Sequence, residues 1–246
     1  MGLKHNKAFK RDSCRVAFLV CGDFCGESGL RKVGLGGTHP LTQRYIVFGV
    51  QRLEIDEIMA LIRAIIFDHS CNVENDNDLF AIVSVNTSDA YNSIMDSFYL
   101  LEDTQLAKHS FLERNSSLSI GELYLYFYGV LNAVYMQQQA LLVLLRKMGI
   151  EFELSELQGC TIFDIRNSFA AHSANRGGKK VKEHSFVLNR RALRQGKLKG
   201  YSANHESGFL SHDTDVSTLI SEWDKVISKY LESIFNMVKE NYEATI

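Results

Sequence analysis

Apolar residues recur at steps of three and four over most of the chain beyond residue 40, which is the spacing of amphipathic helices. The first such stretch runs from Leu41 to Phe67, and a polar loop rich in Asn and Asp follows from His69 to Asp78. A second helical stretch is predicted from Asp78 to about Phe111. β-Branched residues crowd its middle, from Val83 to Thr87, and favour a break there.

Two stretches further along are typical of helix starts. Ser119-Ile-Gly-Glu122 is a capping-box sequence and predicts a helix to about Met148, ended by Gly149. This helix is apolar nearly all round, which predicts a place in the middle of a bundle or in a subunit interface. Thr161-Ile-Phe-Asp164 resembles a second capping box and predicts a short helix that Gly177-Gly178 ends.

Tyrosines also recur on the apolar helix. Two interpretations are open, a set of rings on which a ligand stacks, or core and interface packing with the hydroxyls at the edge, and we favour packing. The residues concerned are Tyr124, Tyr126, Tyr128 and Tyr135.

The last part of the chain combines a basic segment with a long amphipathic helix. Alternation from Lys182 to Leu188 predicts a strand or hairpin, and Asp213 or Thr214 can cap the C-terminal helix. A single proline suits a chain built from long helices. We therefore expect an all-α fold, an up-and-down bundle of four to five helices with a basic hairpin-like insertion before the last helix.

The predicted domain organisation follows from these elements. Residues 1–40 hold six glycines between positions 22 and 37 and are predicted to form an irregular Gly-rich N-terminal arm. Residues 41–246 form a single helical-bundle domain, whose core spans about 119–246 and whose basic insertion spans about 179–212. The glycine segment lacks the Lys-Ser/Thr that completes a phosphate-binding P-loop, so we expect no cofactor.

Composition excludes several classes of protein. With 46% apolar and 23% charged residues the chain has the balance of an ordinary soluble protein, and its net charge of −2 excludes a uniformly basic nucleic-acid binder. Five cysteines without dense spacing do not indicate a disulfide scaffold. No stretch approaches the ~18–20 apolar residues of a membrane span, so we expect a cytoplasmic protein without a membrane partner.

The segment Arg166-Asn-Ser-Phe-Ala-Ala-His172 carries the strongest candidate chemistry. Arginine keeps its charge at cellular pH and suits a phosphate oxygen, whereas histidine exchanges a proton near neutrality. On an ideal helix the six steps between them leave the two side chains about 120° apart, so the geometry permits a shared site without imposing one. The alternative is a helix end, where His172 faces the helix dipole and Arg166 pairs with Asp164, Glu153 or Glu156.

A basic stretch follows this segment. Between Lys179 and Lys199 eight Lys and Arg residues accompany one acid, Glu183, which suits a phosphate backbone. The candidate RNA-binding residues are Arg176, Lys179, Lys180, Lys182, Arg190, Arg191 and Arg194.

At this point the chain resembles the HEPN superfamily of small helical bundles, whose hallmark is an arginine, four to six residues and a histidine. Arg166, Asn167 and His172 match that pattern, and the likeness in helix order covers roughly residues 119–246. The resemblance implies a metal-independent endoribonuclease or RNA-binding protein that acts as a homodimer, with an antitoxin or another partner from a toxin–antitoxin or phage-defence system. It also implies His172 as general acid or base, Arg166 on the phosphate, and Asn167 as an orienting group.

Two other functions compete with this one. Some members of the superfamily are inactive, which makes a helical-bundle interaction or scaffold protein the main alternative. A metal-dependent hydrolase is a third class, since one predicted loop gathers candidate ligands, although solvated polar residues are the simpler interpretation. Those ligands are His69, Cys71, Glu74, Asp76 and Asp78.

Overall fold

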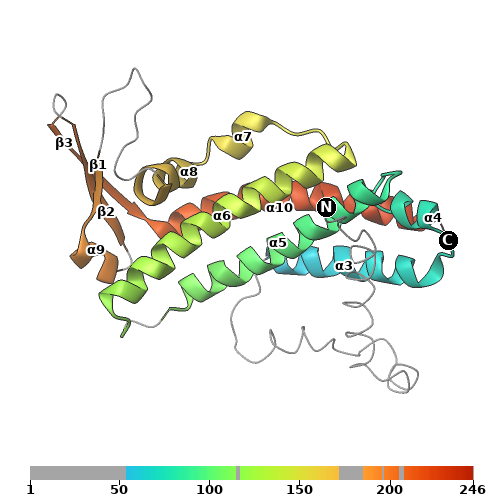
Figure 1. The fold of residues 1–246 in the computed structure, drawn as a ribbon, viewed down its shortest axis with the longest axis horizontal. Helices are drawn as coiled ribbons and strands as arrows, with labels where there is room; N and C mark the ends of the chain where they lie inside the picture. Colours follow the sequence, from blue (N-terminus) through green and yellow to red (C-terminus); the bar gives the residue numbers. More distant parts are fainter. Residues whose placement is uncertain (1–53, 115–116, 172–184, 196, 205–207, 246) are drawn as a thin grey trace, which may run out of the picture. The chain divides into compact units, whose positions relative to one another are not determined.

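A computed structural model describes residues 54–114, 117–171, 185–195, 197–204 and 208–245. The described chain is mostly helical, with a small three-stranded sheet (Figure 1). The predicted arm, residues 1–40, and the first part of the helix predicted from Leu41 lie outside these residues.

The first described helices differ from the prediction at their ends. Helix α3 spans Glu54–Asn72 and therefore continues into the segment that was predicted as a loop. The reason is visible at His69, which is buried and whose Nε2 donates to the backbone carbonyl of Asp78, 2.9 Å away. Helix α4 spans Asp76–Ala81, and the Asn75 side chain caps it.

The predicted break is confirmed. Helix α5 spans Ser88–Leu112, so the chain leaves helical geometry between Ala81 and Ser88. Thr87 restarts it, because its side-chain oxygen accepts a hydrogen bond from the Ala90 N–H.

Helix α6, Ile120–Met148, begins and ends as predicted. The Ser119 hydroxyl accepts from the Glu122 N–H, and the Glu122 carboxylate accepts from the Ser119 N–H. Gly149 ends the helix at φ 70°, a left-handed conformation that favours glycine. Of its 29 residues 14 are buried, so α6 contributes a large part of the core, as predicted for a helix in the middle of a bundle.

After α6 come three short elements: α7 (Leu154–Gln158), α8 (Thr161–Arg166) and the π-helix η1 (Asn167–Ala171). The second capping box was a wrong prediction, because Cys160 occupies the N-cap and no side chain caps α8. The helix predicted through the arginine motif is α-helical only as far as Arg166 and continues as a π-helix.

The basic insertion is a sheet with a helix inside it, which is more than the predicted hairpin. Strands β1 (Ser185–Leu188), β2 (Lys197–Asn204) and β3 (Gly208–Asp215) are antiparallel in the order β1-β2-β3, and α9 (Arg190–Arg194) joins the first two. The last helix, α10, spans Val216–Glu243.

The cap of α10 also differs from the prediction. Strand β3 continues through Asp213 and Thr214 to Asp215, so the helix begins after the residue that follows the two predicted caps. Asp215 takes the capping role, since its carboxylate accepts from the Ser217 N–H at 2.8 Å.

The long helices α3, α5, α6 and α10 lie beside one another, with α7 and α8 on α6 (Figure 1).

A network of buried polar side chains connects α5, α6 and α10. Trp223 on α10 donates to Gln137 on α6, and Lys108 on α5, fully buried, donates to Gln105 and pairs with Asp224. Burial lowers the pKa of Lys108 and raises the pKa of Asp224, which disfavours both charged forms. The attraction between the two groups acts in the opposite direction and favours the charge on each.

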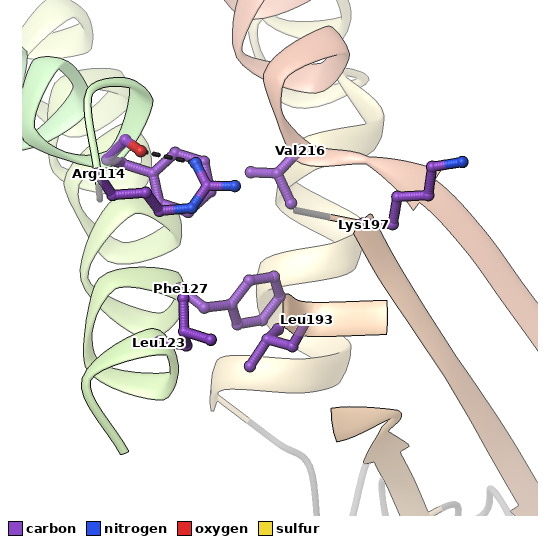
Figure 2. Close-up of a pocket in the computed structure, with 7 residues that line it drawn as sticks. Arg114, Leu123, Phe127, Leu193, Lys197 and Val216 are labelled. Carbon is purple, nitrogen blue, oxygen red and sulfur yellow. Dashed lines mark hydrogen bonds between the residues drawn. The ribbon is translucent and has the colours of Figure 1, made fainter. Parts of the chain in front are cut away.

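The insertion is fixed to the helices at two points. Leu193 of α9 packs beside Phe127 and Leu123 of α6, with Arg114 and Lys197 at the margin (Figure 2). The gap between these side chains holds about 10 Å³, the room of one water molecule at most, so it is a packing seam and not a ligand pocket.

The second point joins the sheet to the π-helix. Phe169 is 1% exposed, and its ring meets Phe186 of β1 edge-to-face at 5.4 Å. A Cβ on Gly200 of β2 would lie 2.7 Å from the Phe169 Cζ and 2.9 Å from the Val187 carbonyl oxygen. Only glycine therefore lets β2 approach the ring this closely.

We expect Gly200→Ala to lower the free energy of unfolding by about 1–3 kcal/mol, because the added methyl overpacks the contact with Phe169. Gly129→Ala is the matched control. A Cβ on Gly129 meets nothing within 4 Å, and the same change in an exposed helix interior adds up to about 1 kcal/mol of stability. Urea denaturation measures both, and equal stability of Gly200→Ala and the unmodified protein would contradict the contact.

Candidate functional site

The candidate site is centred on Arg166, the last residue of α8. Its half-buried guanidinium donates from Nε and Nη2 to the Asn132 Oδ1, at 3.2 Å each, and from Nη1 to the Asn167 Oδ1 at 3.0 Å. The guanidinium also lies over the Tyr135 ring, 4.1 Å from its centroid. Two neutral amides and an aromatic face therefore hold the cation in one orientation.

Helix α6 in turn fixes Asn132. The Asn132 Nδ2 donates to the backbone carbonyl of Tyr128, one turn earlier, at 2.8 Å. With the amide nitrogen used in this way, the amide oxygen is the atom that faces Arg166. The guanidinium position is therefore set by the most deeply packed helix of the described chain and not by a surface loop.

None of the three carboxylates that the sequence offered to Arg166 pairs with it. Glu156 instead accepts from Lys229 at 2.7 Å and from the Tyr230 hydroxyl at 2.6 Å. Among the described residues no carboxylate lies within ion-pair distance of Arg166. The described residues supply neutral oxygens to three of its five N–H groups and no negative charge, which suits the guanidinium to an anion.

The residues after Arg166 do not continue the α-helix on which the predicted angle of 120° was based. Asn167–Ala171 is a π-helix, in which hydrogen bonds run from residue i to i+5. Residues five apart are then the ones that stack, so the estimate from α-helical geometry does not apply to this segment. Single π-turns occur preferentially at functional sites, which agrees with the chemistry of the motif.

The structure places only part of the predicted site. The Asn167 Oδ1 accepts from the Arg166 Nη1, and its role as an orienting group stays a prediction. His172 and the basic residues Arg176, Lys179, Lys180 and Lys182 lie outside the described residues. Arg190, Arg191 and Arg194 are exposed on α9, which lies against the beginning of α6 and not against Arg166.

Sequence reasoning missed Asn132, and it named Tyr135 only among the tyrosines of the apolar helix, without connecting it to Arg166. Both residues precede Arg166 by about thirty residues and lie on another helix. A signal existed for one of them, because an asparagine inside a nearly all-apolar helix needs a polar partner.

The predicted metal-ligand loop does not converge. Within the described part of the chain, no group of three or more His, Cys, Asp or Glu side chains could hold a metal ion. Its histidine, His69, already uses Nε2 on the Asp78 carbonyl, and Cys71 is exposed on the last turn of α3. No helix in the described ranges combines the length and the apolar character that crossing a membrane requires.

No protein-family model matches the chain, and no curated protein or solved structure matches it either.

We expect Asn132→Asp to raise the free energy of unfolding by about 1 kcal/mol, because its charge-assisted hydrogen bonds with Arg166 outweigh the hydrogen bond to the Tyr128 carbonyl that the change removes. Gln139→Glu, on the same exposed face of α6 and seven residues further on, adds the same charge without a guanidinium partner. Thermal or urea denaturation compares the two variants. A stability gain that is equal in both, or absent in Asn132→Asp, would show that an anionic group does not interact with Arg166 from this position.

Proposed function

We propose that this protein is a HEPN-like, metal-independent endoribonuclease or RNA-binding protein that acts as a homodimer. The observation that carries the proposal is Arg166, a guanidinium held in place by neutral groups and left without a carboxylate among the described residues. A fixed cation of this kind is suited to a phosphate oxygen. The resemblance of Arg166, Asn167 and His172 to the superfamily motif connects that cation with RNA.

In the proposed reaction His172 removes the proton from a ribose 2′-hydroxyl, and the 2′-oxygen attacks the adjacent phosphorus. The bond to the 5′-oxygen of the next nucleotide breaks, and that oxygen takes up a proton. The products are a 2′,3′-cyclic phosphate and a 5′-hydroxyl, and no metal ion takes part. Arg166 stabilises the charge on the phosphate oxygens during attack, and Asn167 keeps the guanidinium in position.

Exposed apolar residues beside Asn132 support the homodimer. Leu125 is 72% exposed and Met136 is 42% exposed, and both share the face of α6 that carries Asn132. A second copy across this face would cover them and bring two Arg166 sites together. The up-and-down bundle, toxin–antitoxin or phage-defence partners, and a cytoplasmic location belong to the same proposal.

The alternative is an inactive interaction or scaffold protein of the same architecture. The exposed apolar side chains of α6 would then bind a partner, and Arg166 would serve only to join α8 to α6. The two functions predict different outcomes when the charge of Arg166 is neutralised: only the first predicts a loss of RNA binding or cleavage.

The test is cleavage of single-stranded RNA in the presence of EDTA, with analysis of the product ends. The unmodified protein should leave 2′,3′-cyclic phosphates and should not cut DNA, which has no 2′-hydroxyl. His172→Ala should lower kcat by roughly 100-fold or more, which is the usual contribution of a general acid or base.

Asn132→Asp is the sharper variant, because it leaves Arg166 and His172 intact and neutralises the guanidinium. It should stop cleavage in a protein that is at least as stable as the unmodified one, whereas Gln139→Glu should remain active. Cleavage that persists at full rate in His172→Ala would contradict the nuclease proposal, and RNA binding that survives Asn132→Asp unchanged would contradict the role of Arg166.

A further inference from the structure

A row of tyrosines runs along α6 beside Arg166. Tyr124, Tyr128 and Tyr135 are four and seven residues apart, so their side chains share one side of the helix over about 16 Å. The Tyr124 and Tyr128 ring centroids are 5.8 Å apart with planes tilted by only 32°. Tyr135 lies under the Arg166 guanidinium, so the row of rings ends at the cation.

Tyr128 is the member of the row that is open to a ligand. It is 36% exposed, and the edge-to-face contact with Phe127 at 5.8 Å fixes the ring from the inner side. A Cβ on either Gly121 or Gly129 would meet nothing within 4 Å, so no described residue packs against α6 at these two positions near Tyr128. Partial burial raises the pKa of the Tyr128 hydroxyl, so the ring stays uncharged at neutral pH and does not repel a phosphate.

Positive charge lies at both ends of the row. Arg166 is at one end, and the exposed arginines of α9 are near the other, because Leu193 holds α9 against Leu123 and Phe127 at the beginning of α6 (Figure 2). Among the described residues no carboxylate pairs with any of the α9 arginines, which are Arg190, Arg191 and Arg194.

The combination of rings and positive charge on this surface selects one class of ligand. Aromatic rings between cations fit a polyanion whose repeating units carry flat apolar faces, and single-stranded nucleic acid has both features. A duplex fits less well, because its base faces are stacked on one another and unavailable to Tyr128. An acidic peptide would satisfy the charges and leave the rings without a partner.

We infer that Tyr128 is a base-stacking platform, on which a base of single-stranded RNA stacks while the RNA backbone runs from Arg166 toward α9. Tyr124 and Tyr135 keep the packing role that the sequence favoured. The inference rests on the proposed function and names its substrate as unpaired RNA. It also assigns Tyr128 a role in binding and not in the chemical step.

The experiment uses a single-stranded 2′-fluoro oligonucleotide that carries 2-aminopurine, whose fluorescence falls when the base stacks on a ring and which cannot be cleaved through a 2′-hydroxyl. Binding to the full-length protein should quench the fluorescence. Tyr128→Phe keeps the ring and should keep both quenching and affinity. Tyr128→Ala and Tyr128→Leu should lose the quenching and bind roughly 10- to 100-fold more weakly, the effect of one lost stacking contact.

Tyr99→Ala is the matched control, since Tyr99 is 49% exposed on α5 and lies outside the row. It should change neither signal, and a duplex of the same sequence should bind equally well to the unmodified protein and to Tyr128→Ala. Sedimentation of each variant measures whether its mass in solution has changed.

Three results would overturn the inference, and each is distinct. Unchanged quenching and affinity in Tyr128→Ala would remove the stacking role and leave the function of Arg166 intact. Weaker binding together with a change in mass would show that Tyr128 holds two copies of the chain together. No binding of the oligonucleotide by the unmodified protein would refute the proposed function itself, and the platform with it.

Discussion

The contact between the Phe169 ring and the bare backbone of Gly200 connects the two halves of the candidate site. Phe169 belongs to the π-helix that follows Arg166, and Gly200 belongs to the central strand of the basic sheet. The Phe169 ring occupies the space that a side chain at position 200 would take. This close contact fixes the position of β2 relative to the π-helix Asn167–Ala171. The sheet is therefore packed against the segment that directly follows Arg166.

Helix α6 gives the same site its other half. Its buried side joins α5, α8 and α10, and its exposed side carries the amide and the ring that hold Arg166. The amide and the ring orient the guanidinium, and no carboxylate among the described residues pairs with it.

The sequence predicted the elements whose signals are local. Ser119, Glu122 and Gly149 define α6 through hydrogen bonds within four residues of each end, and the β-branched residues before Thr87 mark the break before α5. The prediction was wrong where the local structure depends on residues that are distant in sequence. His69 belongs to α3, where it bonds to the Asp78 carbonyl, and Asp213 belongs to β3, where it pairs with Lys199 instead of capping α10. The contacts of Asn132 and Tyr135 with Arg166 were missed for the same reason, since only the tertiary fold brings these residues together.

The central claim is that Arg166 binds a phosphate of RNA, and the salt dependence of binding tests it most directly. Each phosphate contact to a single strand contributes about 0.7 to the slope of log binding constant against log salt concentration. With an uncleavable 2′-fluoro strand, Arg166→Gln should make the slope shallower by about 0.7 relative to the unmodified protein. An Arg166→Gln protein that binds with an unchanged slope would contradict the account.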